Sequence, residues 1–215
     1  MENISLRKLI LQASYDAGAC HIGSALSCVD IVDDIYSKMK KEDRFIFSKA
    51  SGVCALYAVL AKRGIIAENK VADYLKKYPL ANKDVSGVIH SVGSLGHGLP
   101  VAVGLALADR TRKVYCLIGD GDVQEGTAYE SLLFARQHKL KNLKIIVDKN
   151  SLQACGATKD ILDIDKALKL LKQLFPIKVV KTIKGKGVSF IENRYEWHYW
   201  NLTPKLLKQA LKELD

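Results

Sequence analysis

Long hydrophobic runs, internal repeats and low-complexity tracts are all missing from this sequence. Without an apolar run of about 20 residues, the chain is not expected to cross a membrane as a helix. The sequence Met1-Glu2-Asn3 begins no apolar signal region, so a signal peptide is not expected either. The absence of low-complexity tracts favours an ordinary globular fold.

Cysteines are few and irregularly placed. The chain has five, an odd number without the short pair spacing of metal sites: Cys20, Cys28, Cys54, Cys116 and Cys155. Such a pattern argues against a disulfide framework and favours buried thiols in a reducing compartment. We therefore expect a cytoplasmic protein.

Arginine is scarce beside lysine, although the net charge is +10. The lysines are dispersed, and no aromatic residues alternate with them in a way that would stack nucleic-acid bases. Nucleic-acid binding is therefore not expected. Positive charge of this kind attracts anionic substrates, including phosphorylated sugars, or an acidic partner subunit, and the sequence does not separate these possibilities.

The chain's 215 residues are enough to bury one substantial core, so we expect a single domain over residues 1–215. Strand-like and helix-like segments alternate along it. This alternation predicts an α/β fold, with a mostly parallel sheet flanked by helices.

One β-α-β unit is especially clear. The apolar run 114–118 ends at Gly119 and predicts a buried strand. Helical spacing follows over 125–138, with Tyr129, Leu132, Leu133 and Ala135 on one face, and 143–147 predicts a second strand. Because ligands collect at the carboxyl ends of parallel strands, Asp120 and Asn150 are expected to be neighbours.

Their chemistry suits one divalent cation and one diphosphate. Magnesium and calcium prefer oxygen ligands, and magnesium usually keeps water and substrate phosphates among them. Asp120, Asn150 and the main-chain carbonyl of Leu152 would supply three oxygens, while Gly121 lets the backbone approach a phosphate closely. Gly-Asp-Gly alone also occurs in ordinary tight turns. The strand, helix, strand and Asn150 together favour the cation site.

The chain resembles the thiamine diphosphate enzymes, and most closely the diphosphate-binding, amino-terminal domain of transketolases. The resemblance extends over nearly the whole chain and rests on five segments. These are Ala19 to Gly23, Asp43 to Lys49, Gly93 to Gly98, Gly119 to Gly126, and Lys184 to Phe190 followed by Glu196-Trp197-His198.

The resemblance implies thiamine diphosphate and Mg²⁺ or Ca²⁺ as cofactors, with Asp120, Asn150 and Leu152 as metal ligands. It implies that Gly121 and Asn150 contact the diphosphate, while main-chain atoms of Gly93 and Leu95 hold the ring portion.

It also implies that His21 and His198 line the substrate channel and act in catalysis, with His198 near the cofactor as well. Glu125 resembles an acidic residue at which the two active sites of a dimer communicate. An acidic residue in the first turn of a helix, complementing the helix dipole, is an equally good interpretation of Glu125.

The chain departs from the family in two ways at the substrate side. The family's Gly-His after Ser48-Lys49 is replaced by Ala50-Ser51-Gly52, which puts Ser51 in the histidine's place near the cofactor. A second family histidine has no counterpart around residues 80–84. A hydroxyl donates a hydrogen bond but carries no charge near neutral pH, so a different donor substrate is one expectation.

A third departure concerns the fold. Leucines at helical spacing predict a helix from Asp163 to Leu174, with Leu168, Leu170, Leu171 and Leu174 on one face. A strand over 177–183 follows directly, where transketolases have a further strand between two helices. We expect that one β-α unit is deleted between Asp160 and Pro176 and that an edge of the sheet is lost.

The family's activating glutamate belongs to a pyrimidine-binding domain that follows this one in full-length transketolases. The sequence ends instead after a helix-like segment from Thr203 to Leu214, with Thr203 as its cap and Pro204 as its first residue. The resemblance therefore implies a split enzyme, in which a carboxyl-terminal subunit supplies that domain. An α2β2 heterotetramer with active sites between unlike subunits is expected.

The function expected from all of this is transfer of a two-carbon ketol unit from a ketose, or ketose phosphate, to an aldose acceptor. One alternative is a modified sugar or a 2-oxo acid as donor. The other alternative is a non-catalytic paralogue that only binds a partner, against which the retained Asp120, Asn150 and His198 argue.

Overall fold

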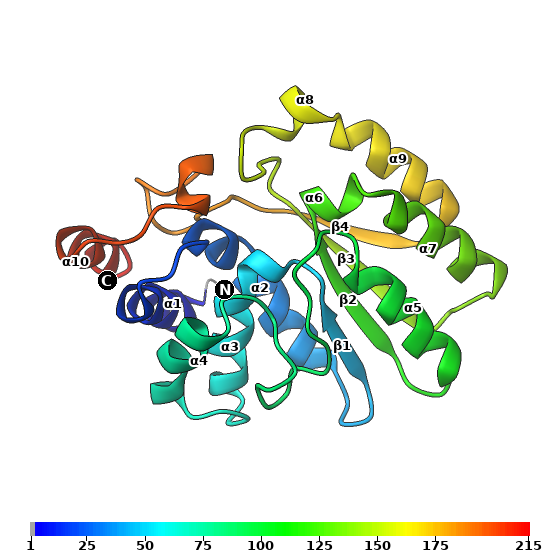
Figure 1. The fold of residues 1–215 in the computed structure, drawn as a ribbon, viewed down its shortest axis with the longest axis horizontal. Helices are drawn as coiled ribbons and strands as arrows, with labels where there is room; N and C mark the ends of the chain where they lie inside the picture. The colour runs from blue at the N-terminus through cyan, green and yellow to red at the C-terminus, as the bar shows by residue number, and fades with distance from the viewer. Residues whose placement is uncertain (1–2) are drawn as a thin grey trace.

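A computed structural model describes residues 3–215, which are built around one four-stranded parallel sheet (Figure 1). The strands are β1 (Arg44–Phe47), β2 (Val114–Gly119), β3 (Leu143–Lys149) and β4 (Ile177–Lys181), in the spatial order β1-β2-β3-β4. All three strand pairs are parallel. The expected α/β class is confirmed, because parallel strands need helical crossovers between them.

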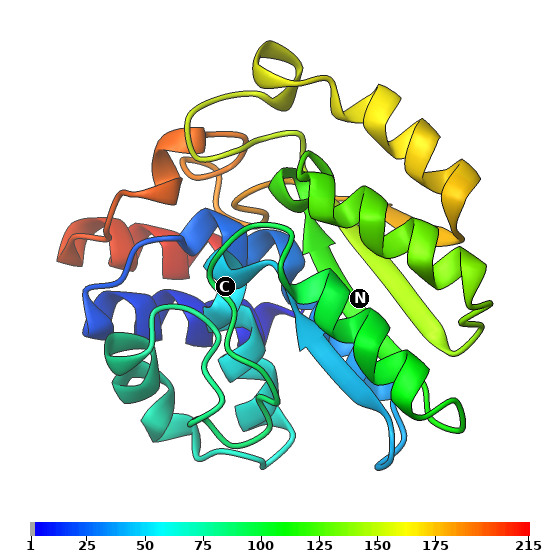
Figure 2. The same cartoon turned by 45° about the vertical axis from the view of Figure 1, so that its right-hand side comes forward.

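Helices cover the sheet from both sides (Figures 1 and 2). The α-helices are α1 (Ile4–Ala17), α2 (Ile22–Lys38), α3 (Val53–Lys62), α4 (Val71–Lys77), α5 (Gly98–Ala108), α6 (Asp120–Val123), α7 (Gly126–Gln137), α8 (Thr158–Ile161), α9 (Ile164–Leu174) and α10 (Pro204–Glu213). Three short 3-10 helices are η1 (Ala50–Gly52), η2 (Glu68–Lys70) and η3 (Tyr195–His198). Helices α5, α7 and α9 lie on one face of the sheet, and α2 lies on the other with α1 and α3 beyond it.

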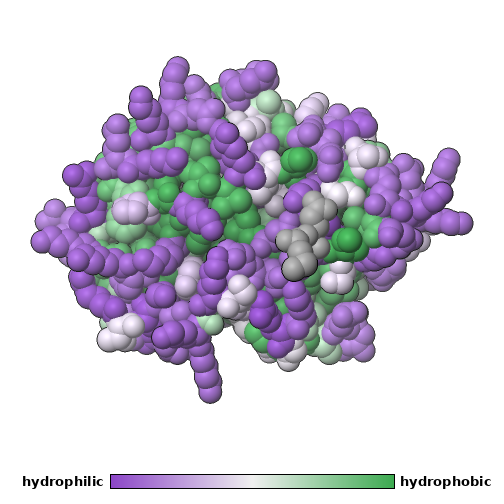
Figure 3. Space-filling model, turned by 180° about the vertical axis from the view of Figure 1, so that it is seen from behind, coloured by the Kyte–Doolittle hydropathy of each residue, from purple (hydrophilic) through white to green (hydrophobic). Residues whose placement is uncertain are grey.

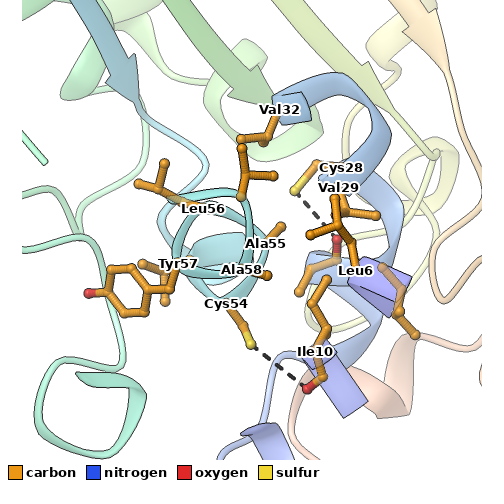
Figure 4. Close-up of a cluster of buried hydrophobic side chains, with 14 of the residues drawn as sticks. Leu6, Ile10, Cys28, Val29, Val32, Cys54, Ala55, Leu56, Tyr57 and Ala58 are labelled. Carbon is orange, nitrogen blue, oxygen red and sulfur yellow. Dashed lines mark hydrogen bonds between the residues drawn. The ribbon is translucent and has the colours of Figure 1, made fainter. Parts of the chain in front are cut away.

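The larger core lies among α1, α2 and α3 (Figure 4). Ile10, Val29 and Leu56 are buried there, and apolar burial of this kind supplies most of the stabilisation of such a layer. Two thiols are part of it, with Cys54 Sγ 3.8 Å from the carbonyl oxygen of Ile10 and Cys28 Sγ 3.7 Å from that of Ala25.

Burial raises the pKa of both of these thiols to about 12, which makes them packing groups rather than nucleophiles. The expectation of buried thiols holds for Cys28, Cys54 and Cys116. Cys20 is half-buried, however, and Cys155 is exposed.

The helix and strand expected after residue 160 are both present as α9 and β4. Asp163 caps α9 by accepting hydrogen bonds from the backbone nitrogens of Asp165 and Lys166, and Thr203 caps α10 through Leu206 N. Two side chains expected on buried faces are instead exposed, namely Leu133 and Leu170.

Small side chains account for the error in α7. Ala128 and Ala135 face the sheet on α7 and let the helix approach closely, so the buried face of the helix is rotated away from Leu133.

No helix within residues 3–215 is long and apolar enough to cross a membrane. The expectation about Met1-Glu2-Asn3 falls mostly outside that range, because Met1 and Glu2 are not among the described residues.

Candidate active site

The carboxyl ends of β2 and β3 bring two predicted site residues together. Asp120 follows β2 as the first residue of α6, and Asn150 follows β3. The carboxylate Oδ2 of Asp120 accepts hydrogen bonds from the backbone nitrogens of Asn150, at 3.0 Å, and Ser151, at 2.7 Å. The expected adjacency of Asp120 and Asn150 is therefore correct.

The other carboxylate oxygen of Asp120 is unsatisfied. Its Oδ1 is buried and has no hydrogen-bond partner among the described residues. Burial raises the pKa of Asp120 to about 6, while Lys49 opposes the shift and Asp148 adds to it. Buried polar atoms are nearly always paired, so an orphaned carboxylate oxygen at a strand end fits a cation ligand.

The loop after β3 carries the other two predicted ligands. Asn150 Nδ2 donates to Ser27 Oγ at 3.0 Å, and Leu152 N donates to Asn150 Oδ1 at 3.0 Å. An amide oxygen has two lone pairs, so this bond orients Asn150 and still leaves a position for a cation. No cluster of three or more His, Cys, Asp or Glu suited to a metal occurs in residues 3–215. The residues nevertheless fit a magnesium ion that takes its remaining ligands from a phosphate and from water.

The loop 93–98 lies against this edge. A Cβ added to Gly121 would be 3.1 Å from Leu95 Cδ1, so the two residues are in direct contact. Leu95 is 48 % exposed, an unusual position for a large apolar side chain beside a buried carboxylate. Leu95 and Gly121 thus lie together next to Asp120, whereas a Cβ added to Gly93 would lie near Leu80 Cδ1, and their cofactor contacts stay a prediction.

Asp122 joins these segments, and the sequence did not indicate it. Its carboxylate accepts hydrogen bonds from Ser48 Oγ (2.6 Å), Gly96 N (2.9 Å) and Gly119 N (2.8 Å). The end of β1, the loop 93–98 and the end of β2 are therefore fixed to one carboxylate. The only available signal was an acidic residue placed directly after Gly-Asp-Gly.

Gly96 offers a test of the loop. Its φ of +76° favours glycine, and an added Cβ would lie 2.7 Å from Glu125 Cβ. Gly96→Ala is expected to displace Leu95 and weaken thiamine diphosphate binding at least about tenfold, or 1.4 kcal/mol, in a calorimetric titration. Gly64→Ala is the control, because Gly64 has φ +68° and open space around it. Equal affinity for the two variants would contradict this role.

A buried ion pair lies beneath Asp120. Lys49 donates to Asp148 Oδ2, and Asp148 also accepts from Ser27 Oγ at 2.8 Å and from the Thr182 hydroxyl. Burial disfavours the charged form of Lys49, but Asp148, with Cys28 and Asp120, more than compensates and the pKa of Lys49 is raised to about 12. Its permanent positive charge balances two buried carboxylates, and the sequence did not indicate this role.

The two predicted catalytic histidines are brought together from distant segments. His21 precedes α2, and His198 ends η3, with ring centroids 4.6 Å apart. Burial lowers the pKa of His21, and the Lys184 ammonium lowers it further. Burial, followed by Lys184, lowers the pKa of His198 to about 3. Both rings are therefore neutral near pH 7, so they can form hydrogen bonds but carry no positive charge.

Lys184 is another residue that the sequence did not assign. It is 2 % exposed, and its Nζ donates to the Gln153 carbonyl at 2.8 Å and lies 3.5 Å from His198 Nδ1. Burial, together with Lys49, lowers the pKa of Lys184 to about 8, so it remains largely protonated at pH 7. A buried cation here is suited to an anionic ligand.

Lys184→Met is expected to raise the pKa of His198, because the Lys184 ammonium is the largest electrostatic cause of its depression. The value should stay below 6.5, since burial remains the dominant cause. Titration of His198 by NMR measures this directly. A pKa of His198 unchanged by the substitution would contradict the coupling.

Ser51 lies on η1 beside His21. The two residues line a cavity of about 180 Å³ together with Cys20, Val53 and Leu75. Ser51 thus lies on the side of the site that carries His21.

Glu125 is the N-cap residue of α7 without a side-chain capping bond, and it packs over Gly96.

The comparisons with known proteins agree with this geometry. The family model of the transketolase thiamine diphosphate-binding domain matches residues 3–196. The chain belongs to the transketolase family. It therefore carries the thiamine diphosphate-binding domain of a transketolase-type transferase.

Three relatives illustrate the range of this transketolase family. An apulose-4-phosphate transketolase subunit of Actinobacillus succinogenes is 36% identical over 253 residues, covering 96% of this chain and 91% of the relative. A 6-deoxy-6-sulfo-D-fructose transketolase subunit of a Clostridium species is 29% identical, covering 98% and 94%. The crystal structure of transketolase from Campylobacter jejuni is similar with a TM-score of 0.85 and 26% identity, covering 98% of this chain and 41% of that one.

Proposed function

We propose that this chain binds thiamine diphosphate through one divalent cation and, with a carboxyl-terminal subunit, transfers a two-carbon ketol unit from a ketose to an aldose. The observation that carries the proposal is the unpaired, buried Oδ1 of Asp120 at the strand edge beside Asn150. Asp120, the Asn150 amide and the Leu152 carbonyl would hold magnesium or calcium.

Other residues of the chain would bind and orient. Gly121 and Asn150 would approach the diphosphate, while Gly93 and Leu95 would hold the ring portion. Thiamine diphosphate supplies the stabilisation of a carbanion that no side chain provides. His21 and His198, both neutral, would hydrogen-bond the oxygens of the sugar, and the Lys184 ammonium would balance negative charge near them.

A partner subunit would complete this site. Large apolar side chains are exposed in the loop 93–98, at the end of α8 and after η3, and a patch built from such side chains would suit a partner surface. They are Leu95, Ile161, Leu162, Tyr199 and Trp200. The partner would carry the pyrimidine-binding domain and the activating glutamate in an α2β2 heterotetramer. The Actinobacillus and Clostridium relatives are both named as transketolase subunits, which fits such an arrangement.

The donor we favour is a modified, anionic ketose. Two relatives are named for apulose 4-phosphate and for 6-deoxy-6-sulfofructose, which are sugars of this kind. The net charge of +10 and buried Lys184 suit such a substrate. A 2-oxo acid is the second candidate, since Ser51 replaces a family histidine and Lys184 could pair with a carboxylate.

Free cysteines at all five positions fit a cytoplasmic location.

A reconstituted complex tests the proposal. The chain is co-purified with a candidate carboxyl-terminal subunit, and ketol transfer from ketose phosphates, a sulfonated ketose and a 2-oxo acid is followed by mass spectrometry. Transfer from an anionic ketose is expected, and it should be absent when each of the two proteins is assayed by itself. Turnover of the 2-oxo acid alone would favour the second candidate. Turnover by the isolated chain would contradict the shared site.

A further inference from the structure

A groove of about 950 Å³ lies at the amino ends of β2, β3 and β4, on the opposite edge of the sheet from Asp120. It is lined by side chains of the sheet and by the ends of α2, α7 and α9. Its apolar lining includes Ile35, Ile146, Leu174, Phe175 and Ile177. Seen from behind, the molecule shows a broad hydrophobic area crossed by hydrophilic side chains (Figure 3).

The groove exists because one face of the sheet is incompletely covered. Parallel sheets normally have helices over both faces. Here α5, α7 and α9 cover one face, whereas α2 alone packs on the other face, near β2 and β3. None of the five residues of β4 is buried. The amino ends of β3 and β4, beside Ile35 and Ile146, are therefore only partly covered by helices.

The comparisons are consistent with a missing cover. The Actinobacillus relative aligns over 253 residues, more than the 215 of this chain, so it carries residues that have no counterpart here. The β-α unit that the sequence indicated as deleted between residues 160 and 176 stays a prediction. If a related chain covers this part of its sheet with its own residues, a segment of another protein could cover it here.

The rim of the groove has one sign of charge. Six basic side chains line it: Lys38, Arg136, Lys139, Lys141, Lys144 and Lys178. Asp34 is the one acidic residue among its described lining residues, and it already pairs with Lys38 at 2.6 Å and Lys178 at 3.9 Å. An apolar floor with a basic rim is complementary to a segment with an apolar face and acidic flanks.

We propose that this groove binds an amphipathic, acidic segment of a partner protein. A second copy of the chain fits less well, because each copy carries +10 and the same basic rim. A small apolar ligand fits less well too, because it could not pair with the six basic side chains that line the groove. A helical segment covers the floor with one face and presents its polar face to solvent.

A defined probe tests this inference independently of the active site. The probe is a fluorescent helical peptide of about 14 residues, with leucine at i, i+3, i+4 and i+7 and glutamate elsewhere. A second peptide carries lysine in place of each glutamate. The groove variant Lys141→Glu/Lys144→Glu is compared with Lys205→Glu/Lys208→Glu on α10, which changes the charge equally at exposed positions away from the groove.

Wild-type protein and the α10 variant are expected to bind the acidic peptide alike, whereas the groove variant binds at least tenfold more weakly. In the wild type, hydrogen exchange should slow in β4 and the turn between α7 and β3 when the acidic peptide is added. This second measurement uses only the wild-type protein, so it does not depend on the folding of a variant. Equal binding of both peptides, equal binding by both variants, or protection elsewhere would overturn the inference. So would a dimer of the chain alone that the groove variant abolishes.

Discussion

Asp120→Asn is expected to stabilise the isolated chain at pH 7 while abolishing its contribution to cofactor binding. Burial raises the folded-state pKa of Asp120 to about 6, from an ordinary value of 3.8. The buried carboxylate is therefore held at a cost of about 3 kcal/mol above pH 6, at 1.36 kcal/mol for each pKa unit. Asparagine keeps an acceptor for the two backbone nitrogens and removes the charge.

The sign of the pH dependence follows from the raised pKa. Between pH 3.8 and about 6 the unfolded chain loses the Asp120 proton before the folded chain does. The free energy of unfolding therefore falls as pH rises through this window, and the fall should be missing in Asp120→Asn. Urea denaturation at pH 4 and at pH 7 measures both effects.

The same substitution removes the anionic cation ligand, so affinity for thiamine diphosphate with magnesium should drop at least about 100-fold. Asp122→Asn is the matched control for the measurement of stability. Asp122 is equally buried but accepts three hydrogen bonds, so this change should destabilise the chain by about 1–3 kcal/mol. A less stable Asp120→Asn protein with unchanged cofactor affinity would contradict the assignment.

Lys49→Met is expected to lower the free energy of unfolding by about 3–5 kcal/mol, because it leaves a buried carboxylate without its counter-charge. Asp148 would keep only its hydrogen bonds to Ser27 and Thr182. Lys49 also lowers the pKa of Asp120, so its loss should move that pKa above 6. Chemical denaturation measures the first effect, and the pH dependence of stability measures the second.

Lys8→Met gives the comparison for Lys49→Met. Lys8 pairs with Asp215 at 2.5 Å on the surface, where an ion pair contributes at most about 1 kcal/mol. Both substitutions remove one lysine and add one apolar side chain. Similar losses of stability in the two variants would show that burial of the Lys49 pair has no special weight.

The strands around the site were predictable because each is a short apolar run that stops at a glycine or a polar residue. Val114 to Gly119 and Leu143 to Lys149 are nearly continuous in burial, as both faces of the parallel sheet are covered there. Helix faces were less predictable. Leu133 and Leu170 are exposed because periodicity places a face only approximately, and packing against small residues such as Ala128 decides its orientation.

The residues of the site also differ in how well the sequence could predict them. Asp120 and Asn150 follow from a general property of strand ends, so the sequence sufficed to place them together. Asp122, Lys49 and Lys184 did not follow, because their partners come from elsewhere in the chain. Ser48 lies 74 residues from Asp122, and Lys49 lies 99 residues from Asp148. Contacts at such separation are fixed by the packed fold rather than by local pattern.

Titration of thiamine diphosphate with magnesium into the chain, in the presence and absence of the carboxyl-terminal subunit, tests the central claim most directly. Asp120→Asn is titrated in parallel. We predict strong binding heat with both subunits, weak heat with this chain alone, and none with the variant. Equal heat from wild type and Asp120→Asn, or none from the complete complex, would contradict a cofactor site built on Asp120 and shared between subunits.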